Sequence, residues 1–168
     1  MRFSRHFLAA GIAAFALALG FTASASAEDR VAGFTYVEEK GHGLLEQKRV
    51  TVTDKDGVLK SKVIHYRDGR VLRDVFRKDG TQEFSHEVWG NGQQREHIEY
   101  DATGKSMTSR KKWHIDGSLE SEAIRKKDGH TLLKEYYSNG KLRKERELFD
   151  KGGFSDVTYR KDGTKWYG

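Results

Sequence analysis

Glycine recurs at an almost constant spacing through most of this 168-residue chain. Ten glycines stand about a dozen positions apart, with so little variation between the gaps that random placement would not produce the pattern. The chain therefore carries a short structural unit that is repeated along its length. The ten glycines are Gly57, Gly69, Gly80, Gly92, Gly104, Gly117, Gly129, Gly140, Gly152 and Gly163.

The residues around each glycine indicate a tight turn between two strands. The preceding residue is Asp or Asn in eight of the ten cases. Both dipeptides tolerate positive φ at the two central positions of a type I′ turn, whose twist matches antiparallel strands. A large ring stands three or four positions before most of these glycines, so the repeating unit is strand, ring, turn. The rings are Tyr66, Phe76, Trp89, Tyr100, Trp113, Tyr136, Tyr137, Phe149 and Tyr159.

Short helices are the alternative, because segments such as "KLRKERELF" contain good helix formers. Only about eight residues separate the turns, which is short for a helix and normal for a strand. In "RVLRDVFRKDG", Val71 and Val75 fall on one face of a strand and Leu72 and Phe76 on the other. We therefore expect an all-β fold, an elongated antiparallel meander of about eleven short strands between Glu46 and Trp166. Both an open single-layer sheet and a curled one fit this pattern.

The segment 1–27 has a different composition from the rest of the chain. Arg2 and Arg5 precede an apolar run from Phe7 to Phe21, and Ala25 to Ala27 fits an A-x-A cleavage site. A membrane anchor is the alternative, but the run is shorter than the roughly 20 residues that span a bilayer. We expect a signal peptide at 1–27, a leader, an irregular first hairpin or a cap at 28–45, and a hairpin-repeat domain at 46–168. The protein should be exported, to the periplasm of a Gram-negative bacterium or to the medium, without a transmembrane segment after cleavage.

Composition leaves little material for a thick core. Beyond Ala27 the apolar share is low, which is also typical of disorder, but all seven Tyr and three Trp recur there regularly. This indicates a thin folded structure without disulfides, since the chain has no Cys. The formal net charge is +6, with Lys and Arg spread among acids rather than gathered in blocks, so we expect no nucleic-acid partner.

Three segments resemble a known repeat family. "YYSNGKLRKE", "HYRDGRVLRD" and "YRKDGTKWY" are similar to the MORN-repeat variant of YwqK-family proteins, many of which are labelled antitoxins of toxin–antitoxin systems. The resemblance covers about Asp54 to Gly168 and implies an elongated sheet of hairpins that acts in protein interaction without a catalytic centre. The family's second glycine after "NGK" is replaced here by charged residues, and an export signal fits poorly with a cytosolic antitoxin. "EYDATGKSMTSR" also resembles a YD repeat of Rhs-type shells.

Catalytic and metal-binding motifs are not evident. "TGKS" lacks the first glycine of a P-loop, because position 99 is Glu99. In "TDKDG", the first and last ligand positions of a calcium loop would fall on Val52 and Val63. The histidines form no H-E-x-x-H pair and are interpreted as exposed sheet residues, although they could meet across strands. We expect no enzyme activity, no catalytic residues, no metal and no cofactor.

Two basic clusters, "SRKKWH" and "KLRKER", and a few rings are the candidate binding residues. The clusters could also be solvated strand faces, and we interpret most rings as the core of the repeat. We expect a protein-binding scaffold or an antitoxin- or immunity-like module whose partner is another protein. The alternatives are an envelope protein that binds anionic polysaccharide and, last, an enzyme with a cross-strand site. The candidate residues are Lys111, Lys112, Trp113, Tyr137, Arg143, Lys144 and Trp166.

Overall fold

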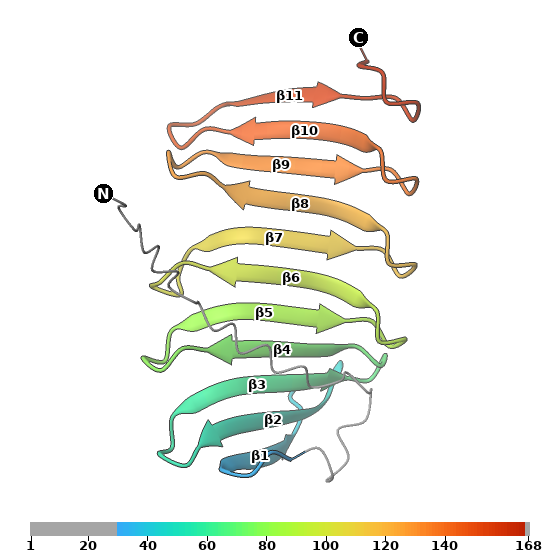
Figure 1. Ribbon diagram of the computed structural model, residues 1–168. Helices are drawn as coiled ribbons and strands as arrows, with labels where there is room; N and C mark the ends of the chain where they lie inside the picture. The colour runs from blue at the N-terminus through green and yellow to red at the C-terminus, as the bar shows by residue number, and fades with distance from the viewer. Residues whose placement is uncertain (1–29, 167–168) are drawn as a thin grey trace, which may run out of the picture.

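A computed structural model describes residues 30–166 of the protein. These residues form one open sheet of eleven strands in which every strand pairs antiparallel with its neighbours in the chain (Figure 1). No helix occurs within the described residues, and the predicted all-β meander is confirmed. The strands are β1 (Phe34–Lys40), β2 (Glu46–Asp54), β3 (Leu59–Tyr66), β4 (Val71–Phe76), β5 (Gln82–Val88), β6 (Gln94–Tyr100), β7 (Met107–Trp113), β8 (Leu119–Arg125), β9 (Thr131–Tyr136), β10 (Leu142–Leu148) and β11 (Phe154–Thr158).

The two ends of the sheet differ from the sequence-based boundaries. Of the three alternatives for the segment 28–45, the structure has the first hairpin, because strand β1 lies there and pairs along its whole length with β2. A strand was also expected after Gly163, but within the described residues only an isolated bridge joins Tyr159 and Lys165 there. The number of strands was thus predicted correctly, although the sheet begins and ends earlier than the range from Glu46 to Trp166 that was expected for the eleven strands. The predicted signal peptide at 1–27 lies outside the described residues.

The turn type predicted from the sequence is wrong. All ten repeat glycines have positive φ, but no other residue type in the described part of the chain does, so the residue before each repeat glycine lacks the positive φ that a type I′ turn requires at both central positions. At the hairpin between β9 and β10, the Gly140 N–H donates to the Tyr137 carbonyl (2.8 Å) and the Tyr137 N–H donates to the Lys141 carbonyl (2.8 Å). This is a type I turn followed by a left-handed glycine, the three-residue hairpin loop with a bulge.

The Asp or Asn before the glycine has a role other than tolerating positive φ. At the β7–β8 hairpin, the Oδ1 atom of Asp116 accepts hydrogen bonds from the Ser118 backbone N–H (2.9 Å) and the Ser118 hydroxyl (2.6 Å). These bonds hold the pKa of Asp116 below its ordinary value. The side chain thus fixes the bulge by bonding two positions ahead. The same backbone bond is made by Asp68, Asp79, Asn91, Asp128, Asn139 and Asp162.

The core of the sheet is small and aliphatic. Val52, Val63, Val88 and Ala123 are the buried hydrophobic side chains among the described residues. The pairing register places the three valines on one face of β2, β3 and β5, while Ala123 lies on the other face. The expectation that the aromatic rings form the core is therefore wrong. The rings lie partly exposed near strand ends, and several stack against cations, as Tyr66 does under Arg70 (4.7 Å).

Candidate functional site: a cationic sheet face

Neighbouring residues of each strand point to opposite faces of this single-layer sheet. Lys112 pairs in register with Glu96 on β6, whereas Lys111 pairs with His97 on the other face. We call the face that carries Glu87, Glu96 and Lys112 the cationic face. The pairing register assigns most residues to one face or the other. Arg95 and Arg143 have no register partner because each is the extra residue of a β-bulge, but their contacts with Glu87 and Glu135 place them on the cationic face.

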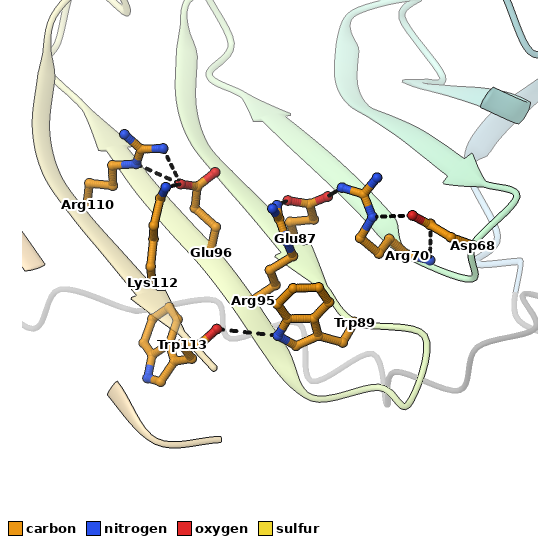
Figure 2. Close-up of polar contacts among 9 residues, drawn as sticks. All are labelled: Asp68, Arg70, Glu87, Trp89, Arg95, Glu96, Arg110, Lys112 and Trp113. Carbon is orange, nitrogen blue, oxygen red and sulfur yellow. Dashed lines mark hydrogen bonds and ion pairs between the residues drawn. The ribbon is translucent and has the colours of Figure 1, made fainter. Parts of the chain in front are cut away.

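A carboxylate held between two cations is the recurring feature of the cationic face. Glu87, on β5, is bridged by Arg70 (2.8 Å) on one side and by Arg95 on the other (Figure 2). Arg70 also contacts Asp68 (2.7 Å), and the guanidinium of Arg95 lies 4.8 Å from the centre of the Trp89 ring. Only 7% of the Glu87 side chain is exposed. Burial of this carboxylate is tolerated because both of its oxygens are paired with arginine.

The same arrangement occurs twice more along the sheet. Glu96 contacts Arg110 (2.6 Å) and Lys112 (3.8 Å), both from β7, as Figure 2 shows. Asp156, on β11, contacts Lys144 and Arg146 of β10, each at 2.9 Å. Hydrogen bonds from Lys144 and then Arg146 lower the pKa of Asp156. The Glu96 group and the Asp156 group each carry one surplus positive charge.

The opposite face shows the inverse arrangement. Lys134, on β9, lies between Glu122 (3.8 Å) and Glu145 (4.0 Å), which leaves one surplus negative charge. The Tyr136 hydroxyl donates to Glu122 (2.6 Å), and partial burial followed by this bond raises the pKa of Tyr136. One lysine shared by two glutamates is thus the counterpart of one carboxylate shared by two cations.

Charge is therefore separated between the two faces of β6–β11, although it looks evenly mixed in the sequence. Among the strand residues, seven cations but only three carboxylates lie on the cationic face, counting the register-paired residues and the bulged Arg95 and Arg143 but not Glu120, the extra residue of β8 at its own bulge. Two cations and four carboxylates lie on the opposite face. The cationic-face set is Arg95, Arg110, Lys112, Arg125, Arg143, Lys144 and Arg146 with Glu96, Glu135 and Asp156; the opposite set is Lys111 and Lys134 with Glu99, Glu122, Glu145 and Glu147.

The structure divides the first predicted basic cluster between the two faces. Lys112 belongs to the cationic face and Lys111 does not. The Trp113 carbonyl accepts a hydrogen bond from the Trp89 indole N–H (3.4 Å), which brings these two tryptophans together at the ends of β5 and β7 (Figure 2).

The second predicted cluster lies three strands away. Arg143 contacts Glu135 (2.5 Å), and Lys144 contacts Asp156 (2.9 Å). The two predicted rings lie at hairpins rather than beside these cations. The Tyr137 hydroxyl donates to the Tyr159 carbonyl (2.7 Å), and Trp166, 56% exposed, bonds through its backbone to Thr158.

Sequence reasoning missed the carboxylates that organise the cationic face, Glu87, Glu96 and Asp156. It also left Arg110 and Arg146, which lie within the two predicted basic clusters, out of the candidate residues. A usable signal was present in the chain. Arg110 with Lys112, and Lys144 with Arg146, are each two positions apart, which places both members of each pair on one face of a strand. The basic clusters were defined as runs of consecutive residues, and consecutive residues of a strand point to opposite faces.

The histidines do meet across strands. The rings of His86 and His97 are opposite each other on β5 and β6, with centroids 5.8 Å apart. Burial lowers the pKa of His86 and of His65, so the expectation of exposed histidines is wrong for these residues. Within residues 30–166, no group of three or more Cys, His, Asp or Glu is arranged to hold a metal ion.

Large exposed apolar side chains are concentrated at the two ends of the sheet. Of those in the described part of the chain, five lie between Val31 and Leu45 and four between Leu148 and Trp166, against two in the long stretch between. Leu44 is 89% exposed and Phe154, on the last strand, is 58% exposed. The middle of the sheet thus offers little apolar contact, and its ends offer much more.

A helix long and apolar enough to cross a membrane is not found among residues 30–166. No family model matches the chain, and no curated protein matches it. Among solved structures, the chain is similar to part of the accessory secretory protein 1, 2 and 3 assembly of Streptococcus pneumoniae, with 17% identity, a TM-score of 0.41 and coverage of 63% of this chain and 20% of that one. It is also similar to part of TarM, with 11% identity, a TM-score of 0.29 and coverage of 70% of this chain and 20% of that one. The chain thus spans about a fifth of the length of either structure.

Proposed function

We propose that this is an exported, non-enzymatic hairpin-repeat protein of the MORN-variant type that serves as a protein-binding scaffold or immunity-like module. The observation that carries the proposal is the concentration of large exposed apolar side chains at the two ends of a one-layer sheet. Exposed apolar groups of this size, set against a polar surface elsewhere, are typical of protein interaction sites.

The ends of the sheet also offer backbone groups for pairing. Strands β1 and β11 each have one named strand beside them, so each presents an edge. An extended segment of a partner can add to such an edge through main-chain hydrogen bonds. Strand β11, with the sequence FSDVT, carries one charge, whereas β1, FTYVEEK, carries three. The β11 edge therefore carries fewer charges and is the better candidate for strand addition, although at its C-terminal end the Thr158 carbonyl already accepts a hydrogen bond from the Trp166 N–H (2.9 Å).

A second candidate function is supported by a different observation, the surplus of cations on the cationic face. Such a surface would attract an anionic polysaccharide of the cell envelope, with an affinity that falls steeply with salt. The carboxylates interleaved between the cations work against a uniformly anionic chain, because each cation pair already shares one acid. A protein partner, with its own mixture of charges, fits better.

An affinity pull-down with the chain from Glu28 to Gly168 tests the proposal. The bait is exposed to an envelope extract and washed at low and at high salt, next to a Phe154→Ser variant that removes the exposed ring of β11. We expect a stoichiometric protein that resists high salt and is lost with Phe154→Ser. Recovery of anionic glycan alone, released at high salt, would overturn the scaffold function in favour of polysaccharide binding.

A further inference from the structure

We propose that the cationic face of β6–β11 binds an acidic, extended segment of a partner protein, with carboxylates at every second residue. This inference rests on the proposed scaffold function and adds the surface and the chemistry of the partner. It concerns one face of the sheet rather than its apolar ends, and the two meet at β11, where the guanidinium of Arg146 lies 4.5 Å from the centre of the Phe154 ring.

The cations of the Glu87 and Glu96 groups are more exposed to solvent than the carboxylate they share, so an anion in solution can reach them. The Glu96 side chain is 17% exposed, whereas its partners Arg110 and Lys112 are 40% and 38% exposed. Arg70 and Arg95 are likewise more exposed than Glu87. In these two groups the carboxylates fix the cations in place and the cations face the solvent, whereas in the third group Asp156 (33%), Lys144 (29%) and Arg146 (35%) are about equally exposed. Charge-assisted contacts to a partner would therefore be made without first ordering these side chains.

Spacing favours an extended polypeptide as the ligand. Arg110 and Lys112 are two positions apart on one strand, as are Lys144 and Arg146, so each pair is separated by roughly 6.7 Å along the strand. Alternate side chains of an extended peptide repeat at the same roughly 6.7 Å interval and point to one side. A segment with Glu or Asp at every second position thus matches both cation pairs in register. A polysaccharide has no reason to share this period.

Aromatic residues beside the cations fit a protein interface. The Trp89 ring lies 4.8 Å from the guanidinium of Arg95, and its indole N–H donates to the Trp113 carbonyl at the end of β7 (Figure 2). Tryptophan and arginine are the residues that most often contribute strongly to protein–protein binding. These indoles also supply a fluorescence signal for a ligand that docks nearby.

A defined peptide tests the proposal without an unknown partner. The probe is a labelled 12-residue peptide that alternates Glu and Ser, compared with a peptide of the same composition in which six Glu precede six Ser. Polygalacturonate serves as the polysaccharide probe. Binding is measured by fluorescence anisotropy at low salt to the chain from Glu28 to Gly168, and sedimentation under the same conditions reports self-association.

Two double variants test which face of the sheet binds the peptide. They are matched because each replaces one lysine of β7 and one lysine of β9 or β10 with glutamine. Lys112→Gln with Lys144→Gln alters the cationic face, and Lys111→Gln with Lys134→Gln alters the opposite face. We expect the first variant to bind the alternating peptide roughly tenfold more weakly and the second to bind within about twofold of the unaltered chain. The block peptide should bind more weakly than the alternating one. Circular dichroism confirms that both variants are folded.

Three results would overturn the proposal. Equal losses in the two variants would mean that net charge, and not the cationic face, governs binding. Tighter binding of polygalacturonate than of the alternating peptide, with the same dependence on Lys112 and Lys144, would make a glycan the occupant. Salt-sensitive self-association that disappears in the first variant would make a second copy the occupant. In each case a salt-resistant partner lost with Phe154→Ser would still support the scaffold function.

Discussion

The side-chain amide of Asn139, at one hairpin, donates to the backbone carbonyl of Lys161, at the next hairpin on the same edge of the sheet (3.3 Å). The amide of Asn91 makes the equivalent bond to the Ile115 carbonyl (3.2 Å). These two asparagines precede repeat glycines where six other repeats have Asp. Asp could accept the bond within its own turn equally well, but an ionised Asp has no N–H to donate. Asn therefore joins one turn to the next.

Replacing Asn139 with Asp should consequently lower the free energy of unfolding by about 1 kcal/mol or more, because a donor is lost and a carboxylate faces a carbonyl. Urea denaturation of the folded chain measures the change. The control is Asp128→Asn, at a turn where the acceptor is retained and the charge alone is removed, and it should change stability by less. A larger loss for the control than for Asn139→Asp would contradict the role assigned to the amide.

Two glycine substitutions separate two reasons for glycine at a turn: the positive φ of the backbone, and the lack of space for a Cβ atom beside a neighbouring strand. Gly92 has a φ of 81° and open space around it, so Gly92→Ala should cost about 1–2 kcal/mol from backbone strain alone. At Gly104, where φ is 69°, an added Cβ would lie 2.6 Å from the Gln82 backbone nitrogen. Gly104→Ala should therefore cost clearly more than Gly92→Ala in urea unfolding. Equal costs would show that the β6–β7 turn can move away from β5.

Glu87 should contribute much more to stability than a comparable exposed acid. Glu87→Gln would leave Arg70 and Arg95 beside each other without their shared counter-charge, in a place where 7% of the side chain is exposed. We expect a loss of about 3 kcal/mol in the free energy of unfolding. Glu135→Gln, which disrupts the exposed contact with Arg143, should cost less than about 1 kcal/mol. Similar costs for the two variants would contradict the view that Glu87 is a buried structural centre.

Acid should destabilise the hairpins through their turn aspartates. The pKa of Asp116 is lowered from its ordinary value of 3.8 mainly by the Ser118 hydroxyl, and the pKa of Asp162 is lowered from 3.8 by the Thr164 N–H and hydroxyl. A carboxyl whose pKa is lower in the folded state stabilises the fold above its unfolded pKa, and this contribution is lost as the pH falls through the folded value.

The melting temperature should therefore fall between about pH 6 and pH 3, and it should fall less in the variant Asp116→Asn with Asp162→Asn. Asn keeps the oxygen that accepts the turn bond but does not titrate. Thermal melts followed by circular dichroism at the two pH values provide the comparison. An identical loss in both proteins would assign the acid sensitivity to groups other than these turns.

Much of the fold could be predicted because its signals are local. A glycine at nearly every twelfth position, usually preceded by Asp or Asn, is sufficient to indicate hairpins and to count them. The turn type was wrong because Asp116 and Asn139 suggested tolerance of positive φ, whereas their oxygens in fact bond the residue after the glycine. The hairpin that contains β1 was only one of three alternatives for the segment 28–45, because Gly33, Gly41 and Gly43 do not follow the regular spacing of the other glycines.

The candidate site could be predicted only in part, because it depends on which residues share a face across several strands. Lys111 and Lys112 look equivalent in "SRKKWH", and only the register assigns them to opposite faces. Register in turn depends on bulges, such as those at Arg95 and Arg143, that single residues do not reveal. Sequence reasoning could have added one step: residues two positions apart on a strand share a face, so Lys144 and Arg146 could have been assigned to the same face.

The central claim is that Lys112, and not Lys111, lies on the cationic face of a one-layer sheet. Since the chain has no Cys, engineered cysteine pairs test it directly. Ser121 is the register partner of Lys112 on β8. Under mild oxidation, Lys112→Cys with Ser121→Cys should form an intrachain disulfide, and Lys111→Cys with Ser121→Cys should not. Efficient crosslinking of the second pair and failure of the first would mean that the strand is shifted by one residue and that the assigned faces are reversed.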